Sequence, residues 1–373
     1  MNETELERKR DKMEKKLRAG IIGATGYVGQ RFVTLLADHP WFEISVLAAS
    51  ARSAGKSYGE AVEGRWKMDG EIPPFIAAMP VEDTADLEKI CEACDFLFCA
   101  VDMKKDEIRL LEERIARLET PVISNNSAHR WTEDVPMLIP EINADHTRLI
   151  ARQRKRLGTQ RGFIAVKPNC SIQSYVPALS PLLDFGIEQI SVCTYQAISG
   201  AGKTFADWPE MDRNIIPYIG GEEEKSEKEP LRIWGQLTDD RVIPLARPVI
   251  SSQCIRVGAQ EGHLAAVSVK FNQKPPRELI IDRWSSYRSL PQLAGLPSAP
   301  DPFLIYLEDD NRPQPLLDSM AGRGMAVTIG RLRDDPLFDW KFVCLSHNTL
   351  RGAAGGGVLS AELLKHQGYL KAK

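Results

Sequence analysis

The sequence predicts a two-domain α/β protein, in which a doubly wound parallel sheet precedes an α+β domain with a mixed, largely antiparallel sheet. The chain has 373 residues, more than one ordinary hydrophobic core accommodates. Strand and helix patterns alternate through its first half, which is typical of parallel sheets with helical crossovers. From Gly186 onward, long strands with alternating side chains follow one another with few helices between them, which favours antiparallel pairing.

The first domain is expected over residues 18–168, after a charged extension over residues 1–17 that is interpreted as a solvated helix. A strand, a glycine-rich turn and a helix with apolar spacing lie within AGIIGATGYVGQRFVTLLADHP. Later strands are expected at FEISVLAAS, PPFIAA, CDFLFCAVD, TPVISNNS and RGFIAVKP, with a helix at DEIRLLEERIARLE. Ligands bind at the C-terminal ends of the strands in such sheets, so the residues there are candidates for function.

The second domain is expected over residues 169–347. Its strands are expected at IEQISVCTYQAIS, RPVISSQCIRV, HLAAVSVKF, GMAVTIGRL and DWKFVCLSH, and their sheet could offer one face to substrate and the other to a partner subunit. The segment SGAGKTFADWPEMDRNIIPYIGGEEEK is expected to be a long loop with functional residues. Residues 348–373 are expected to form a glycine-rich turn and an amphipathic helix that packs back on the first domain.

Composition argues against several classes of protein, namely nucleic-acid-binding, membrane-spanning and secreted proteins. A net charge of −3 supplies no basic field for nucleic acid, and no apolar run approaches the roughly 20 residues that cross a bilayer. The N-terminal segment lacks the apolar centre of a signal peptide. Seven scattered cysteines indicate free thiols in a reducing compartment, so a cytoplasmic protein is expected. Cys91 and Cys94 form a C-x-x-C with no second pair nearby, so they are interpreted as buried structure and no metal site is expected.

The turn after the first strand carries Gly23, Gly26 and Gly29 in the spacing G-x-x-G-x-x-G. Glycines at this turn let the backbone approach a pyrophosphate, whose charge then lies at the N-terminus of the following helix. The spacing is a variant of the usual dinucleotide fingerprint and is weak alone. Its position between a strand and a helix is the context that the fingerprint requires, and it indicates a Rossmann-like domain.

The end of the second strand indicates which dinucleotide binds. An enzyme that uses NAD is expected to place Asp or Glu there, on the ribose hydroxyls. Here the strand ends at Ser50 and is followed by Arg52, Ser53 and Lys56, whose cationic and hydroxyl groups suit a 2′-phosphate. NADP is therefore the expected cofactor.

Cys170 follows the last strand of the first domain, in VKPNCSIQS. A thiol at the end of a strand can reach a cofactor, whereas one in mid-strand cannot. A cysteine nucleophile also needs a partner base, because only the thiolate attacks. Among six histidines, His263 is the candidate, since it begins a strand and lies close in sequence to Arg256.

With these residues in place, the chain resembles the aspartate-semialdehyde dehydrogenases, of the branch found in archaea, fungi and some bacteria. The resemblance runs from about residue 18 to residue 366. One departure is RVGAQEGH, where the family more often has proline after the valine, which could alter the loop near His263. The matching segments, in order, are GIIGATGYVGQRF, SARSAGKSY, SNNSAHRWTEDVPMLIPEIN, KPNCS, TYQAISGAG, IGGEEEK, CIRVGAQEGH, RPQPLLDSMAGRGMAVTIGRLRDD and SHNTLRGAAGG.

The resemblance implies reversible reductive dephosphorylation of L-4-aspartyl phosphate to L-aspartate 4-semialdehyde with NADPH, in the biosynthesis of lysine, threonine, methionine and isoleucine. It implies that Cys170 forms an acyl thioester and expels phosphate. His263 would act as general acid and base, and Gln196 would orient the acyl group. A homodimer or homotetramer is expected, with inorganic phosphate and the aspartyl compounds as its small-molecule partners and neither nucleic acid nor membrane among them.

The resemblance also assigns the charged side chains. Arg256 would hold the α-carboxylate through a planar two-pronged contact that lysine could not make. Glu222 would take the substrate ammonium, with Glu223 as the alternative register. The phosphate would be held by Lys225, Arg130 and Asn169. The residues implied for NADP are Gly23, Thr25, Gly26, Tyr27, Val28 and Gly29 at the turn, Ser50, Arg52 and Ser53 at the 2′-phosphate, and Ser199, Gly200, Gly202, Asn348 and Gly352 toward the nicotinamide.

Two alternatives stay open. An NADP-dependent malonyl-CoA reductase on the same fold would share the cysteine, the histidine and the cofactor turn but not the substrate contacts. A non-catalytic NADP-binding sensor would be expected to have lost Cys170 or His263, and both are present.

Overall fold

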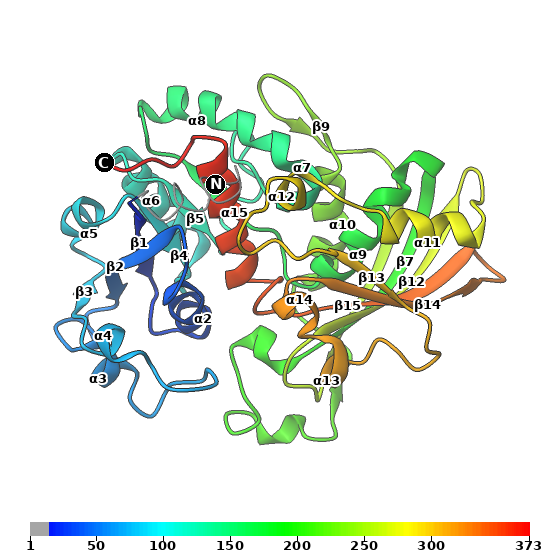
Figure 1. Ribbon diagram of the computed structural model, residues 1–373, viewed down its shortest axis with the longest axis horizontal. Coiled ribbons are helices and arrows are strands. Elements are labelled where there is room, and N and C mark those ends of the chain that lie inside the picture. The colour runs from blue at the N-terminus through cyan, green and yellow to red at the C-terminus, as the bar shows by residue number, and fades with distance from the viewer. Residues whose placement is uncertain (1–14) are drawn as a thin grey trace, which may run out of the picture.

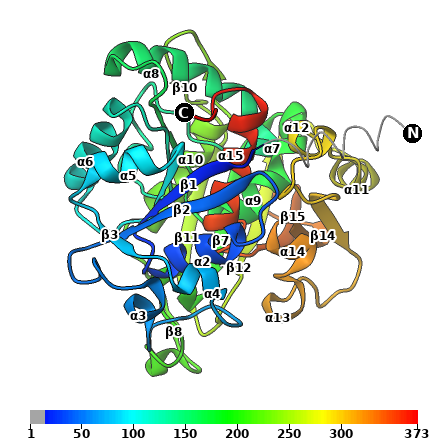
Figure 2. The same cartoon turned by 60° about the vertical axis from the view of Figure 1, so that its left-hand side comes forward.

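The computed structural model describes residues 15–373, so the helix expected within the charged extension lies largely outside the described residues. Figure 1 shows two lobes with the C-terminal helix between them, and Figure 2 shows the molecule with the first lobe turned toward the viewer. Within residues 15–373, no helix combines the length and the apolar character needed to span a membrane.

The first lobe contains a six-stranded sheet in which every pairing is parallel, in the order β3-β2-β1-β4-β5-β6. The predicted doubly wound sheet is therefore confirmed, and the reversal of strand order beside β1 opens the crevice in which such folds bind ligands. Its strands are β1 (Leu17–Ile22), β2 (Phe42–Ala49), β3 (Val81–Asp83), β4 (Phe96–Cys99), β5 (Val122–Ser124) and β6 (Ile164–Val166). Its helices are α2 (Tyr27–Leu36), α3 (Tyr58–Val62), α4 (Pro74–Ala77), α5 (Leu87–Ala93), α6 (Lys105–Arg117), α7 (Pro140–Asn143) and α8 (Leu149–Leu157).

The strand predicted at PPFIAA is wrong. The segment forms the short helix α4, with Pro73 at its N-cap and Pro74 in its first turn. Proline has no N–H to lose at the start of a helix and its fixed φ suits that position, so the two prolines start a turn of helix here. The edge strand of the sheet is instead β3, whose three residues were too few for a pattern to reveal.

The second lobe contains a seven-stranded mixed sheet in the order β13-β14-β15-β12-β7-β11-β8. Two pairings, β7 with β11 and β13 with β14, are parallel, and the other four are antiparallel. The expected strands are present, while β8 and β13 were not expected. The strands are β7 (Ile187–Gln196), β8 (Ile215–Ile216), β11 (Val249–Val257), β12 (His263–Phe271), β13 (Leu304–Leu307), β14 (Val327–Asp334) and β15 (Trp340–Ser346), and β9 (Gln236–Leu237) pairs separately with β10 (Val242–Ile243).

Helices cover one face of this second sheet. Helix α9 (Ile172–Leu179) packs on β12, β14 and β15, and α10 (Glu222–Ile233) packs on β11. Along β7, buried residues such as Val192 and Thr194 alternate with the more exposed Ser191, Cys193 and Tyr195, so the opposite face stays open in the single chain. The remaining helices are α11 (Arg277–Ser285), α12 (Leu290–Leu293), α13 (Pro315–Asp318), α14 (Ala321–Gly324) and α15 (Ala354–His366).

Helix α15 returns to the first lobe, as expected, and packs against α2, β5 and α7 (Figure 1). The prediction that it is amphipathic is wrong, because every residue from Ala354 to Leu364 is buried. A helix that is buried on all sides needs no polar face. Its position between the lobes brings the turn before it beside Cys170.

Candidate active site

Cys170 lies in the turn between β6 and α9. The turn is fixed by Asn169, whose Oδ1 accepts hydrogen bonds from the backbone N–H of Ser171 (2.8 Å) and from its hydroxyl (2.6 Å). Cys170 Sγ lies 3.5 Å from His263 Nε2, and the two residues are 93 positions apart in the sequence. The predicted cysteine–histidine pair is therefore brought together. Cys170 follows a strand of the first sheet, and His263 begins a strand of the second.

His263 begins β12 and is fully buried. Its Nδ1 accepts a hydrogen bond from the backbone N–H of Ala197 at 3.1 Å, so the neutral ring carries its proton on Nε2, toward the sulfur. Burial, followed by the charge of Arg256, holds the pKa of His263 well below its usual value. The ring is therefore neutral near neutral pH and is placed to donate from Nε2.

The thiol of Cys170 is surrounded by opposing influences. Burial, and then the Glu222 carboxylate, raise its pKa, while Lys167, Arg130 and Arg256 act against that rise. The balance keeps the pKa above the ordinary value, so the thiol form is favoured without a ligand. Neutralising Glu222 would remove the largest charge that opposes the thiolate.

Glu222 is the centre of a hydrogen-bond network beside the cysteine. Its carboxylate accepts from Asn169 Nδ2 at 3.1 and 2.9 Å, from Lys225 Nζ at 2.7 Å and from Gln196 Nε2 at 3.4 Å. Burial opposes ionisation, but Lys225 and the hydrogen bonds hold the pKa of Glu222 below its usual value. Glu223 accepts instead from the backbone N–H of Cys254 on β11 at 3.3 Å and does not line the cavity, so of the two only Glu222 lies beside the cysteine.

Arg256 lies close behind His263 and does not line the cavity itself. Its Nη1 donates to the Ala197 carbonyl at 2.6 Å, and a Cβ added at Gly200 would lie 3.0 Å from both this nitrogen and His263 Nε2. Glycine at position 200 therefore leaves open the space in front of both side chains. Arg256 is 6% exposed, and burial lowers its pKa.

Glu229 is a residue that the sequence did not reveal. It lies on α10, is 1% exposed, and bridges Arg130 Nη1 (2.9 Å) and the backbone N–H of Asn169 (2.6 Å). Arg130 also donates from Nε to the Lys167 carbonyl at 3.0 Å. The buried carboxylate thus fixes both the arginine and the peptide next to Cys170. The sequence GEEEKSEKE looks like a solvated charge run, because the buried residues within it recur only at helical spacing. Glu229 was therefore not recognised as buried.

Lys167 was also missed. It is 3% exposed, and its Nζ donates to the Pro168 carbonyl at 3.1 Å, with no carboxylate within ion-pair distance in the described chain. Burial lowers the pKa of Lys167 to about 7, while Cys170 acts in the opposite direction. A charged residue directly after a fully apolar strand was the available signal, since a buried lysine without an ion-pair partner is unusual.

A cavity of about 230 Å³ lies beside Cys170 and is bordered by both lobes. It brings together nine of the predicted residues with Lys167, which was not predicted. The predicted residues in its wall are Val28, Arg130, Asn169, Cys170, Ser199, Gly200, Glu222, Asn348 and Gly352.

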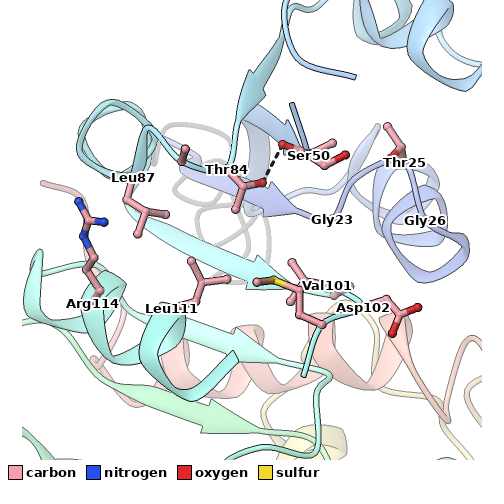
Figure 3. Close-up of a pocket in the computed structure, with 14 residues that line it drawn as sticks. Gly23, Thr25, Gly26, Ser50, Thr84, Leu87, Val101, Asp102, Leu111 and Arg114 are labelled. Carbon is pink, nitrogen blue, oxygen red and sulfur yellow. Dashed lines mark hydrogen bonds between the residues drawn. The ribbon is translucent and has the colours of Figure 1, made fainter. Parts of the chain in front are cut away.

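A larger cavity of about 630 Å³ lies along the C-terminal ends of β1, β2 and β4. Figure 3 shows the turn with Gly23, Thr25 and Gly26 at one end of it and Arg114 at the other. Apolar side chains such as Leu87, Val101 and Leu111 line it and suit a planar ring. Ser50 and Thr84 form part of its edge, beside β2.

The three glycines of the turn are explained by different features of the structure. Gly23 has φ +82°, and an added Cβ would lie 2.4 Å from the Ala100 carbonyl oxygen. At Gly29 a Cβ would lie 2.1 Å from the Gly23 carbonyl oxygen, so this glycine permits α2 to pack on the turn. Gly26 has room for a Cβ and is the N-cap of α2, with no side-chain cap. The backbone at Gly26 is thus the part of the turn that a pyrophosphate can approach.

The residues predicted for the 2′-phosphate follow β2. Ser50 and Arg52 are exposed, whereas Ser53 is 4% exposed and its backbone N–H bonds the Ser50 carbonyl at 2.8 Å. Arg52 makes no ion pair with any residue that the structure describes. An unpaired guanidinium at this edge, with no acid at the end of β2, fits a phosphate on the ribose.

Glu261 connects the two lobes beside the predicted nicotinamide end. Its carboxylate accepts from Tyr27 Oη at 2.8 Å and from Arg31 at 3.2 Å in the first lobe. It accepts from Ser199 Oγ at 2.7 Å in the second, and Asn348 Nδ2 donates to the same hydroxyl at 2.7 Å. The sequence AQEGH placed this acid near His263, but its bridging role depends on contacts between the lobes.

Two other sequence features have structural explanations. Gly258, the departure from the family pattern, lies where a Cβ would come within 2.4 Å of the Met211 carbonyl oxygen, so a side chain would displace the neighbouring loop. Cys91 and Cys94 are free and buried, and burial raises the pKa of Cys94 to about 12, as expected for structural thiols. Residues 15–373 hold no group of three or more His, Cys, Asp or Glu side chains arranged for a metal ion.

Comparison with known proteins identifies two family models in the chain. The semialdehyde dehydrogenase NAD binding domain matches residues 18–150, and the semialdehyde dehydrogenase dimerisation domain matches residues 179–351. The aspartate-semialdehyde dehydrogenase of Archaeoglobus fulgidus is 41% identical, covering 92% of this chain and 97% of that protein. That of Schizosaccharomyces pombe is 42% identical, covering 95% and 99%.

A solved structure, that of the Candida albicans aspartate semialdehyde dehydrogenase with NADP, superposes with a TM-score of 0.85 at 35% identity. It covers 95% of this chain and 100% of that one. The Vibrio cholerae enzyme II superposes with a TM-score of 0.71 at 24% identity, covering 95% and 100%, which shows the same fold.

Proposed function

The chain belongs to the aspartate-semialdehyde dehydrogenase family, and on that premise we propose how its own residues divide the work of catalysis. The enzyme interconverts L-4-aspartyl phosphate and L-aspartate 4-semialdehyde with NADP as cofactor, an oxidoreductase reaction of amino-acid biosynthesis. The comparisons do not favour the alternative of a malonyl-CoA reductase. The proposals concern site residues, domain limits, assembly and location.

Cys170 is the nucleophile. Its sulfur forms a bond to the acyl carbon of aspartyl phosphate, the bond from that carbon to the phosphate oxygen breaks, and phosphate leaves with the electron pair. NADPH supplies the hydride that turns the resulting thioester into the aldehyde. The observation that carries the assignment is the 3.5 Å separation of Cys170 Sγ and His263 Nε2, with Cys170 in the wall of a cavity that both lobes border.

His263 manages the proton at its Nε2. Because the Ala197 amide donates to Nδ1, the neutral ring carries its proton on Nε2, where it can donate a hydrogen bond to the thiolate sulfur or to a developing oxyanion. To take the thiol proton of Cys170 at Nε2, the ring must give up the Ala197 hydrogen bond and carry its own proton on Nδ1 instead. The low pKa of the ring favours its role as a neutral donor.

The substrate's charges determine which side chains hold it. The ammonium is taken by Glu222, whose neutralisation then favours the Cys170 thiolate. The α-carboxylate is taken by Arg256, once its contact with the Ala197 carbonyl loosens. The phosphate is held by Arg130, Lys225 and Asn169, and Gln196 orients the acyl group through its proximity to Glu222.

The cofactor is assigned to the larger cavity and the site between the lobes. Gly23, Thr25, Gly26, Tyr27, Val28 and Gly29 would hold the pyrophosphate. Ser50, Arg52 and Ser53 would hold the 2′-phosphate. The nicotinamide end would lie against Ser199, Gly200, Gly202, Asn348 and Gly352.

The division of the chain follows these roles, with an NADP-binding domain over 18–168, a catalytic domain over 169–347 and a returning helix over 348–373. The open face of the second sheet, which carries Ser191, Cys193 and Tyr195, would form the interface of a homodimer or of a tetramer built from dimers. The free cysteines suit a reducing cytoplasm.

The test is a steady-state assay of purified protein with aspartate semialdehyde, phosphate and NADP, run beside NAD and beside malonyl-CoA with NADPH. Reduction of NADP that depends on phosphate, with little reduction of NAD and no response to malonyl-CoA, is expected. Reduction of NADP independent of phosphate would contradict the acyl-phosphate chemistry. Light scattering of the same protein tests the dimer, and a monomer at micromolar concentration would contradict it.

A further inference from the structure

A third cavity, of about 380 Å³, borders the active site on the side of α10. It opens to solvent, since Trp131 in its wall is 47% exposed and the Lys228 side chain is 59% exposed. Arg130 lines both this cavity and the one that contains Cys170. The residues of its wall that matter here are Lys105, Arg130, Trp131, Gly220, Lys225 and Lys228.

The charge of the cavity is positive. Four cationic side chains and two carboxylates line it. Arg130 is paired with Glu229 at 2.9 Å and Lys228 with Glu224 at 2.7 Å, whereas Lys105 makes no ion pair with any residue that the structure describes. A recess with an excess of one sign of charge concentrates ions of the opposite sign and raises their rate of association.

The backbone adds to this field. Helix α10 begins at Glu222, directly after Gly220 and Gly221 in the wall, and α6 begins at Lys105. The N-terminus of a helix carries a partial positive charge and free N–H groups. Two helices of 12 and 13 residues therefore begin at the cavity whose side chains are already cationic.

The partition between this cavity and Cys170 is made of charged groups that an anion can rearrange. Lys225 lies in the wall of the basic cavity, Glu222 lies in the wall of the Cys170 cavity, and the two are joined by an ion pair of 2.7 Å. An incoming anion competes with Glu222 for Lys225. Once Lys225 turns to the anion, Glu222 is free to take the ammonium of the substrate.

We propose that this basic cavity is a separate mouth of the active site, through which a phosphoryl dianion reaches Arg130 and Lys225. The anion is either free phosphate or the phosphoryl group of the acyl phosphate. The proposal rests on the proposed function and adds to it a route distinct from the cofactor cavity. Phosphate then binds and leaves while the cofactor cavity is filled.

The first test blocks the mouth. At Gly220 the nearest atom to an added Cβ is Tyr218 Oη at 3.9 Å, and its φ lies outside the left-handed region, so a side chain fits without strain. In Gly220→Trp, kcat/KM for phosphate should fall at least about tenfold because the indole fills the opening. Gly220→Ala, the matched control, should stay within about twofold of wild type.

The affinity for NADPH, measured by fluorescence titration, should not change in either variant. Equal kcat/KM for phosphate in the wild-type and Gly220→Trp enzymes would overturn the proposal. A loss of NADPH affinity that accounts for the fall in activity would also overturn it, since the two routes would then not be separate.

The second test removes charge. The double variant Lys105→Gln/Lys228→Gln should lower kcat/KM for phosphate about tenfold at low salt and should flatten its dependence on ionic strength. The matched control is Lys89→Gln/Lys274→Gln, two lysines that pair with carboxylates at 2.6 Å and lie elsewhere on the surface. Identical salt dependence of kcat/KM in the two double variants would contradict the proposal that phosphate enters through the basic cavity.

The direction of the assay distinguishes the two sources of the dianion. A fall in kcat/KM in both directions of the reaction would show that free phosphate and acyl phosphate both use the mouth. A fall only in the direction that consumes free phosphate would show that free phosphate alone uses it. No effect in either direction would overturn the proposal. If NADP reduction by the wild-type enzyme does not depend on phosphate, the proposed function fails. That result is distinguishable from failure of the mouth, which would leave the wild-type dependence intact.

Discussion

The cavity along the first sheet and the cavity at Cys170 are built from different kinds of residue. The larger one, along the first sheet, is lined mostly by glycines, small side chains and apolar groups, with its charged residues at the edges. The smaller one, between the lobes, is surrounded by buried ionised groups, including Glu222, Glu229, Arg130 and Lys167. The first accommodates a ligand mainly by shape and backbone, and the second by a fixed arrangement of charge.

This difference predicts different responses to substitution. A change at the edge of the larger cavity removes one solvated contact and should cause a graded loss of affinity. A change within the smaller one leaves a buried partner without its counter-ion, which costs several kcal/mol. The following predictions test that contrast, in order of decreasing expected effect.

Cys170→Ser should lower turnover by roughly a thousandfold or more, because a hydroxyl is a far poorer nucleophile than a thiolate near neutral pH. Binding of NADPH should stay within about twofold, since the cofactor cavity is unchanged. Steady-state kinetics and fluorescence titration measure the two. Near-normal turnover in this variant would exclude the covalent mechanism.

Glu229→Ala should destabilise the fold by about 3–5 kcal/mol, because Arg130 would stay buried without its carboxylate. It should also raise KM for phosphate, whereas Glu229→Gln should restore part of the stability. Thermal unfolding and phosphate titration measure these effects. The control is Glu224→Ala on the same helix, whose exposed carboxylate should leave the unfolding midpoint unchanged. An unfolding midpoint for Glu229→Ala equal to that of the control would refute the positioning role.

Lys167→Met should stabilise the fold by roughly 2–4 kcal/mol at pH 7, although it removes a cation beside Cys170. Because the pKa of Lys167 is about 7 in the folded state and 10.5 for an ordinary lysine, the unfolded chain binds more protons between those limits. Wild-type stability therefore rises with pH across that window. The gain should be largest below pH 7 and should vanish above about pH 10.5. A gain independent of pH, measured by denaturant unfolding, would show that Lys167 is not a buried cation.

Arg52→Ala should weaken NADPH binding about tenfold and leave NADH binding unchanged, because the exposed guanidinium would contact only the 2′-phosphate. Equilibrium titration with both nucleotides measures the ratio. Lys56→Ala, on the same loop, shows whether the second cation contributes. An unchanged ratio of the two affinities would rule out the assigned role of Arg52.

Glu222→Gln should lower the pKa of the Cys170 thiol, because Glu222 is the charge that raises it most after the effect of burial. The rate of alkylation by iodoacetamide, followed against pH, should therefore rise at a lower pH than in wild type. Turnover should fall at the same time, since the substrate ammonium loses its partner. A profile shifted to higher pH would contradict the assigned electrostatics.

The same contrast explains what could be predicted from the sequence. The glycine turn, the strand ends and the residues after β2 follow from local pattern, because short-range geometry fixes a strand, a turn and a helix start. Glu229 and Glu261 could not be assigned, because each acts through partners distant in the sequence. Position 229 belongs to a run of charges that normally indicates solvent, and only its packing under Arg130 shows that it is buried.

Two errors have different origins, one local and one tertiary. PPFIAA forms a helix because its two prolines start one, which overrode the apolar content of the segment. Helix α15 is buried on all sides because the lobes enclose it, and nothing in its own residues required two neighbours.

By itself, the sequence determined the two sheets, the dinucleotide turn and the cysteine, histidine and charged residues of the family motifs. Only the tertiary structure decided that His263 presents Nε2 to the sulfur, that Glu222 rather than Glu223 faces it, and that a basic cavity borders Arg130. The physical reason is the separation along the sequence over which each effect acts. Backbone preferences act over a few residues, whereas the pKa values and hydrogen bonds around Cys170 depend on side chains brought together by the packing of two domains. The reactivity of VKPNCSIQS is therefore a property of its surroundings as much as of its own residues.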